Sequence, residues 1–255
     1  MRSDRDGSSL KAFLFRLIAI LISFAIVAIF AEAALRIFTP SRLRYSVGER
    51  NFFCRFDREL GWAPLENLSG MQGIGEERFF VHQNQFGLRG PDDMQLKKTP
   101  GRKRRLILGD SYIWGFGVNQ QNLFSTPEVH RTNDEIINFG VSGYGTDQEY
   151  LLLQRIWPDM RPELVVLIVC TDNDRVDNRT NIRYDGYRKP YFAPSPAGGL
   201  ALEGQPVPYS LQVHIRENWL VRHLWLARTA VAAATVVFPT PPLPVNSKIR
   251  TWHLG

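Results

Sequence analysis

The sequence predicts an α/β fold in which a doubly wound parallel sheet follows an N-terminal membrane-spanning helix. Three apolar segments, RRLILGD from Arg104, IINFGVSG from Ile136 and ELVVLIVCTDND from Glu163, have the composition of strands that helices cover on both faces. Between the second and third segments, TDQEYLLLQRIW is typical of an amphipathic helix that Thr146 or Asp147 would cap. A strand, a helix and a strand at this spacing predict a right-handed parallel crossover, and therefore a doubly wound sheet.

The N-terminal segment predicts a single membrane anchor. Residues 12–31 read AFLFRLIAILISFAIVAIFA, with Arg16 as the only charge. This length suits a hydrocarbon core of about 30 Å at about 1.5 Å per residue. The alternative is a cleaved signal peptide, which the small residues Ala31 and Ala33 on either side of Glu32 favour, but the apolar stretch is longer than a usual signal core. Residues 1–11 would form a cytoplasmic tail, although basic residues on both sides of the span leave its orientation open.

Composition and charge limit the classes of function. The 255 residues are 44% hydrophobic, which is enough for one sizeable core and for one or at most two domains. The net charge is +6, but the only dense basic run, KKTPGRKRR at 97–105, is interpreted as a solvated linker that enters the core, so we expect no nucleic-acid partner. Cys54 and Cys170 have neither disulfide nor metal-site spacing, and Cys170 is expected to be a buried thiol. We expect no cofactor and no metal.

The rest of the chain is divided by composition. Residues 41–100 predict an ordered extension with a strand-like run in ERFFVHQNQFGLRG, and 101–255 predict the sheet domain. Residues 185–210 are rich in Gly, Pro and Tyr and are expected to be too irregular for the core. Residues 217–238 predict one long apolar helix, packed on the surface or in a second membrane contact, which the prolines at 239–244 end.

Glycine and polar residues follow each predicted strand. In a doubly wound sheet the carboxyl ends of the strands line one edge, which is where ligands bind. That edge would therefore collect a hydroxyl, glycine amides and a carboxamide. The residues are Gly109, Asp110 and Ser111 after the first strand, Gly143 and Gly145 after the second, and Thr171, Asp172, Asn173 and Asp174 after the third.

This set of residues suits acyl transfer. A serine nucleophile attacks a carbonyl while hydrogen-bond donors hold the oxygen that becomes negative, and each donor contributes about 3 kcal/mol. Here the nucleophile would be Ser111, and the donors its own N–H, the N–H of Gly143 and the amide of Asn173. Asp110 and Asp174 are expected to support the site. The alternative is ordinary turn chemistry, to which Gly-Asp-Ser also belongs.

The same segments resemble a known family. LILGDSYIWGFGV, INFGVSGYGTDQEYLL and VVLIVCTDNDRVDN resemble, in order and spacing, the first three conserved blocks of the SGNH (GDSL-type) hydrolases, which are esterases and acetylhydrolases on a flavodoxin-like three-layer fold. ELGWAP, NQFGLRG and EAALRIF resemble the lead-in of bacterial membrane-anchored members. The resemblance runs from Phe30 to about Phe238. It implies Ser111 as nucleophile, Gly143 and Asn173 as oxyanion-hole positions, and a periplasmic or extracellular domain.

The sequence departs from the family pattern in one respect. The family carries a late Asp-x-x-His, whose histidine takes the serine proton, and this chain has no such spacing. The remaining strands of the fold are also missing, so we expect that a C-terminal part has been lost. None of the histidines has an aspartate at the matching position; they are His82, His130, His214, His223 and His253.

Three classes of function follow. The first is a membrane-anchored, extracytoplasmic serine esterase that acts on an acyl or acetyl ester of a cell-envelope glycan or lipid. A glycan O-acyltransferase shares its first half-reaction. The second is an inactive or truncated derivative that binds a glycan or a partner, and the third is a structural, membrane-tethered interaction protein.

Overall fold

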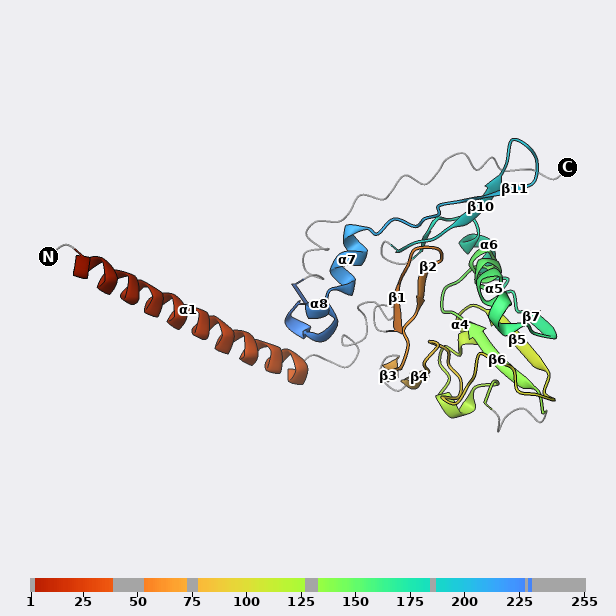
Figure 1. Ribbon diagram of the computed structural model, residues 1–255, viewed down its shortest axis with the longest axis horizontal. Coiled ribbons are helices and arrows are strands. Elements are labelled where there is room, and N and C mark those ends of the chain that lie inside the picture. The colour runs from red at the N-terminus through yellow and green to blue at the C-terminus, as the bar shows by residue number, and fades with distance from the viewer. Residues whose placement is uncertain are drawn as a thin grey trace.

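A computed structural model describes residues 3–38, 53–72, 78–126, 133–183, 187–227 and 229–230 (Figure 1). The long helix α1 extends away from a mixed α/β body, whose parallel sheet lies at the opposite end of the molecule. In chain order the elements are α1 (Ser3–Phe38), β1 (Cys54–Asp57), β2 (Gly61–Pro64), β3 (Leu68–Gln72), β4 (Phe79–Gln83), β5 (Arg104–Gly109), α4 (Ser111–Trp114), the 3-10 helix η1 (Gln120–Asn122), β6 (Glu135–Gly140), α5 (Thr146–Met160), β7 (Leu164–Leu167), α6 (Asp174–Asp177), β8 (Ile182–Arg183), β9 (Tyr187–Arg188), β10 (Tyr191–Pro194), β11 (Leu200–Glu203), α7 (Leu211–Glu217) and α8 (Trp219–His223).

The helix α1 contains the predicted span. Its Lys11–Phe38 part, 28 residues long, is the one helix among the described residues that is long and apolar enough to cross a membrane. Apolar side chains such as Phe15 and Phe24 are exposed along it. Length and composition make α1 a candidate membrane span, because an exposed apolar surface of this size is unfavourable in water.

The predicted parallel sheet is confirmed. Its strands have the order β6-β5-β7, and both pairs are parallel. Ile107 in β5 lies opposite Asn138 in β6 and Val166 in β7. The helix α5 connects β6 to β7 and contacts β5, as the sequence predicts.

The predicted cap of α5 is wrong. The helix begins after Gly145, so Thr146 and Asp147 lie in its first turn. A Cβ atom at position 145 would lie 2.6 Å from Asn178 Oδ1, so any residue other than glycine would displace the Asn178 side chain. Asn178 Oδ1 accepts from the N–H of Asp147 at 3.3 Å, and Asp147 Oδ1 accepts from the N–H of Gln148 at 2.7 Å. The N–H groups of the first turn are therefore bound by Asp147 in the same turn and by Asn178, which follows α6.

The third strand is not covered on both faces by the described residues. Leu164 is 44% exposed and Leu167 is 48% exposed, whereas Leu106 and Leu108 in β5 are buried. The strand β7 is an edge strand that ends at Leu167, so it lacks the neighbours that bury β5. Cys170 is half-buried rather than buried, because it follows this partly exposed edge.

The extension before the sheet forms two antiparallel hairpins, β1–β2 and β3–β4. The strand predicted in ERFFVHQNQFGLRG is β4. Trp62 in β2 is fully buried, and its ring lies 5.5 Å from that of Tyr144, edge to face. The Tyr144 hydroxyl donates to the Trp62 carbonyl at 2.5 Å. One buried cluster thus joins the extension to the residues that follow β6.

Two expectations for the later part of the chain are wrong. Residues 185–210 were expected to be loop outside the core, but their described part contains β9 and the β10–β11 hairpin. Within it Tyr187 is buried against the ring of Trp62, and Lys189 is buried in an ion pair with Asp147. The single helix expected over 217–238 is interrupted in its described part: α7 ends at Glu217, Asn218 caps α8, and α8 ends before Leu224. Residues 231–238 lie outside the described residues.

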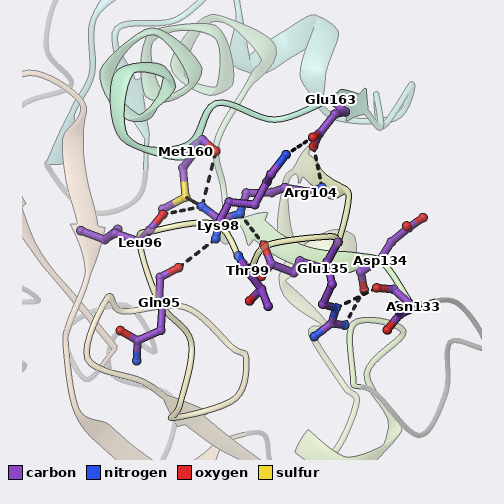
Figure 2. Close-up of polar contacts among 11 residues, drawn as sticks. Gln95, Leu96, Lys98, Thr99, Arg104, Asn133, Asp134, Glu135, Met160 and Glu163 are labelled. Atoms are coloured by element: carbon purple, nitrogen blue, oxygen red, sulfur yellow. Dashed lines mark hydrogen bonds and ion pairs between the residues drawn. The ribbon is translucent and has the colours of Figure 1, made fainter.

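The basic run 97–105 is a largely exposed linker that enters the core at Arg104, as predicted (Figure 2). Arg104, the first residue of β5, is buried, and its Nε donates to Glu135 Oε2 at 2.8 Å. Glu135 lies opposite Arg104 in the sheet register, and the Arg104 Nη2 donates to the Gln95 carbonyl at 3.0 Å. The side chains of Lys98 and Glu163 form an ion pair beside them, and Glu163 Oε2 accepts from the N–H of Arg104 at 2.7 Å. These charges connect the amino ends of the three parallel strands.

Candidate active site

Ser111 lies where β5 ends and the chain turns into α4. Asp110 is the N-cap of α4, and its Oδ1 accepts from the N–H of Tyr112 at 2.9 Å. A Cβ atom at Gly109 would lie 2.3 Å from Ile113 Cγ1, so glycine lets the chain turn back tightly. Ser111 is half-buried, and neither its hydroxyl nor its N–H has a hydrogen-bond partner among the described residues. Both groups are therefore available to a ligand at the edge of the sheet.

The end of β6 lies against α4. The N–H of Val141 donates to the Gly109 carbonyl at 3.0 Å, and Asn138 Nδ2 donates to the Ile113 carbonyl at 2.7 Å. Gly143 is buried with φ +79°, a conformation that favours glycine. Its N–H has no partner within the described part of the chain. The predicted donor of the second strand is thus brought to the same edge as the Gly-Asp-Ser turn.

The third strand contributes Asn173, whose amide contacts two carboxylates. Asn173 Nδ2 donates to Asp110 Oδ2 at 3.0 Å and to Asp177 Oδ2 at 3.2 Å. The opposite amide orientation would aim the oxygen at both carboxylates, so the charges fix this one. The structure therefore brings Asn173 to the end of β5, but both of its amide hydrogens are bound to carboxylates rather than free for an oxyanion.

The Asp174 side chain binds a backbone N–H of the segment between β7 and α6. It is buried at the start of α6, and its Oδ2 accepts from the N–H of Cys170 at 2.8 Å. Burial raises the pKa of Asp174 to about 6, and the nearby charge of Asp110 adds to the rise. Asp174 thus supports the turn after β7.

Glu149 is a site residue that sequence reasoning missed. It lies in the first turn of α5, fully buried, and burial raises its pKa to about 8, with contributions from the charges of Asp174 and Asp110. Neither carboxyl oxygen has a hydrogen-bond partner among the residues described. Glu149 is therefore mostly protonated at neutral pH. The sequence offered no signal, because an acidic residue in the first turn of a helix is normally solvated.

Two cationic side chains, buried Lys189 and half-buried Arg183, balance the other carboxylates. Lys189 forms an ion pair with Asp147 and also donates to the Pro190 carbonyl at 3.2 Å. Arg183 Nη1 lies 2.8 Å from Asp177 Oδ1. Within the described ranges, no group of three or more His, Cys, Asp or Glu side chains is arranged to hold a metal ion. The acidic residues beside Ser111 are thus balanced by protons and cationic side chains.

Arg89 is the second residue that sequence reasoning missed. Its buried guanidinium donates to five acceptors, and it lies 4.9 Å from the ring centroid of Trp114. Burial lowers the pKa of Arg89 to about 10, so it stays charged at neutral pH. The acceptors are the carbonyls of Phe80 (3.1 Å), Trp114 (3.2 Å), Gly115 (2.6 Å) and Val118 (2.8 Å) and the side-chain oxygen of Gln120 (3.2 Å). Arg89 thus joins the extension to the turn that follows Ser111.

The described histidines are all bound away from Ser111. His82 lies between Ser69 Oγ and Asp92 Oδ1, each at 2.6 Å, on the β3–β4 hairpin. The ring of His214 packs on a tyrosine, and His223 Nδ1 lies 2.8 Å from the Trp219 carbonyl. The other two histidines of the sequence, at positions 130 and 253, lie outside the described residues.

Comparisons with known proteins do not assign the chain to a family. No protein-family model matches the chain, and no characterised protein matches it. The class of site is therefore defined by its own residues: an unpartnered serine at a strand end, two backbone donors and a bridging carboxamide.

Proposed function

We propose that the chain is a membrane-anchored, extracytoplasmic serine esterase of the SGNH type, with Ser111 as nucleophile. The observation that carries this proposal is the contact between Asn173 Nδ2 and Asp110 Oδ2 at 3.0 Å, since it joins two of the three resembling segments beside Ser111. Parallel strands bring their carboxyl ends to one edge, which favours a ligand site there. The substrate class is an acyl ester of an envelope glycan or lipid.

The proposed reaction begins with attack of Ser111 Oγ on the ester carbonyl carbon. The new C–O bond converts the carbonyl oxygen to an oxyanion, to which the N–H groups of Ser111 and Gly143 would donate. The alcohol then leaves with the serine proton, which a base must transfer, and water releases the acyl group from Ser111. Asn173 would become the third donor when the oxyanion replaces Asp110 as the acceptor of one amide hydrogen.

Active-site labelling tests the proposal. The full chain in detergent micelles is treated with a fluorophosphonate probe, which reacts with activated serines. We expect the wild type to be labelled and Ser111→Ala to lose the label. Ser142→Ala is the matched control, because Ser142 is also half-buried and directly precedes Gly143. An unlabelled wild type would contradict the esterase assignment.

A second candidate function is binding without turnover. It is favoured by the two amide hydrogens of Asn173 bound to Asp110 and Asp177, and by the three described histidines that contact other groups. In this case the wild type would stay unlabelled but would bind acetylated glycan fragments, and Asn173→Ala would weaken that binding.

The fate of the acyl group separates a hydrolase from an O-acyltransferase. Wild-type protein that has not been treated with the probe is given an activated acetyl ester with and without a glycan acceptor. A hydrolase releases acetate at the same rate in both mixtures. Transfer of the acetyl group to the glycan would assign the transferase instead.

A further inference from the structure

The helix α8 and the turn after it expose apolar side chains beside the carboxyl end of α1. Trp219 is 63% exposed, Leu220 is 50% exposed and Leu226 is 39% exposed. We call these three residues the α8 patch. The Trp219 ring stacks on that of His223 with a centroid distance of 4.8 Å, so the exposed indole is held in one orientation.

Specific contacts fix the α8 patch to α1. The carboxylate of Glu32 accepts from the N–H of Trp225 at 2.9 Å and from the N–H of Leu226 at 2.8 Å. Arg36, one helical turn further, donates to the His223 carbonyl at 2.9 Å and pairs with Glu32 at 2.8 Å. Glu32 thus provides the N–H groups after α8 with an acceptor from a distant part of the chain.

The position of these contacts along α1 sets the depth of the patch. Residues 12–31 form the apolar run, and Glu32 and Arg36 are the first charged residues after it. If α1 spans the bilayer, these two residues lie at the level of the lipid headgroups. The patch is bonded to them and lies there too. In Figure 1, α8 is beside the end of α1, whereas the parallel sheet lies on the far side of the body.

We propose that the α8 patch inserts into the headgroup region of the bilayer that α1 crosses. Tryptophan prefers this interface, because its ring is apolar and its N–H is polar, and leucines beside it bury apolar area. The Arg36 side chain, 52% exposed, can meet lipid phosphate. A second attachment beside the α1 anchor fixes the orientation of the body on the membrane. This inference rests on the membrane anchoring proposed above.

Nitroxide labels at three positions test the inference in the full chain. The protein is reconstituted in vesicles of phosphatidylcholine and phosphatidylglycerol, with Cys170→Ser as background, since Cys54 is buried. The labels are placed by Leu220→Cys in the patch, Ile22→Cys in the apolar run and Leu200→Cys in β11, an exposed residue on the far side of the body. Collisions with apolar oxygen and with a water-soluble nickel chelate report depth.

The expected result is a gradient of accessibility. Ile22 should favour oxygen strongly, Leu220 should favour oxygen over nickel to a smaller degree, and Leu200 should favour nickel. Leu226→Cys should repeat the result for Leu220. If Ile22 lies in the bilayer but Leu220 resembles Leu200, the inference is overturned while the anchor stands. If Ile22 favours nickel, both the membrane anchor and the inference about the α8 patch are contradicted. Spin–spin broadening at Leu220 would show that a second copy covers the patch, which also overturns the inference.

Discussion

Asn173 and Asp110 hold each other in position at the edge of the sheet. The amide donates to two carboxylates, at 3.0 Å and 3.2 Å, and hydrogen bonds to charged groups contribute about 1.5–3 kcal/mol each. An oxyanion on a substrate at Ser111 would have to compete with Asp110 for one of these hydrogens. In the free protein Asn173 therefore braces the turn, while the N–H groups of Ser111 and Gly143 are the donors already available.

Glu149 makes stability depend on pH in a defined direction. Its pKa is about 8 in the folded protein against an ordinary value of 4.5, so the folded state keeps a proton that the unfolded state releases. The free energy of unfolding therefore falls as pH rises between these values, by up to about 1.4 kcal/mol per pH unit. Glu149→Gln cannot ionise. We expect it to match the wild type near pH 4.5 and to exceed it in stability near pH 8.

Urea unfolding across this pH range measures the effect. Glu59→Gln is the control, because Glu59 is an exposed carboxylate, and it should leave the slope of the wild type unchanged. Parallel pH profiles for the wild type and Glu149→Gln would contradict the protonated state of Glu149.

Arg89 is expected to be needed for both stability and the geometry of the serine turn. Lysine has three donors against the five of arginine, so Arg89→Lys leaves buried carbonyls without partners, at about 1–3 kcal/mol each. We expect a loss of at least about 2 kcal/mol in urea unfolding and slower fluorophosphonate labelling of Ser111. Arg55→Lys is the control, since Arg55 is exposed and its pair with Glu66 is long, at 3.5 Å. Equal unfolding midpoints for the two variants would refute this role.

At the scale of elements, the amino ends of β5, β6 and β7 are joined by charge (Figure 2). Arg104 is buried against Glu135, and removing one partner of a buried pair costs about 3–5 kcal/mol. Glu135→Gln should therefore destabilise the protein by about 3 kcal/mol in urea unfolding. Glu203→Gln, on the exposed hairpin β10–β11, should have almost no effect. A small effect of Glu135→Gln would mean that the backbone acceptors of Arg104 suffice.

The same cluster predicts acid sensitivity. The Lys98 side chain lowers the pKa of Glu163 to about 2. The pKa of Glu135 is also lowered: desolvation raises it, but the hydrogen bonds and charge of its partners outweigh that effect. Carboxylates with lowered pKa stabilise the folded state above their ordinary value of about 4.5 and lose that contribution as pH falls through the folded value.

The elements that were predicted correctly are those with a local signal. The β5 and β6 runs and the spacing of α5 are visible in the sequence because a strand or an amphipathic helix repeats within its own residues. The strand ends that carry Asp110 and Asn173 could be placed at one edge in advance, because parallel strands end at the same edge of a sheet. The buried pair of Arg104 with Glu135 could not be predicted, since only the pairing of β5 with β6 brings the two residues together.

Arg89 and Glu149 were missed for the same reason. Each is an ordinary charged residue in the sequence, and only the packing of distant elements buries it. The exposure of β7 is likewise a property of the sheet: Leu164 and Leu167 are apolar in the sequence, but β7 is an edge of the described sheet. Burial is decided by neighbours that are far away in the chain.

At the scale of the whole molecule, the extension and the sheet share one core. Leu60, Trp62 and Leu88 belong to the same buried cluster as Leu106 and Ile137. Arg89 adds polar contacts from the extension to the turn after Ser111. The body that carries the site is therefore built from both parts, and α1 is joined to it by the residues around α8.

The orientation of this body across the membrane is open to a direct test. The basic residues on the two sides of residues 12–31 are balanced, so the side is inferred from the resemblance to anchored extracytoplasmic hydrolases. In bacterial spheroplasts a membrane-impermeant maleimide should label Leu200→Cys in the Cys170→Ser background, because Leu200 is 69% exposed. Ser8→Cys, in the tail 1–11, should be labelled only after lysis.

Each departure from this pattern has a distinct meaning. Labelling of Ser8→Cys in intact spheroplasts and of Leu200→Cys only after lysis would place the body in the cytoplasm, away from any envelope ester, while the fluorophosphonate reaction of Ser111 would be unaffected. A mature chain that has lost position 8, seen as a lower mass, would show that the apolar run is a cleaved signal. In that case the α8 patch would lose its partner in α1, because cleavage after Ala33 would remove Glu32 and leave Arg36 in a chain without an anchor.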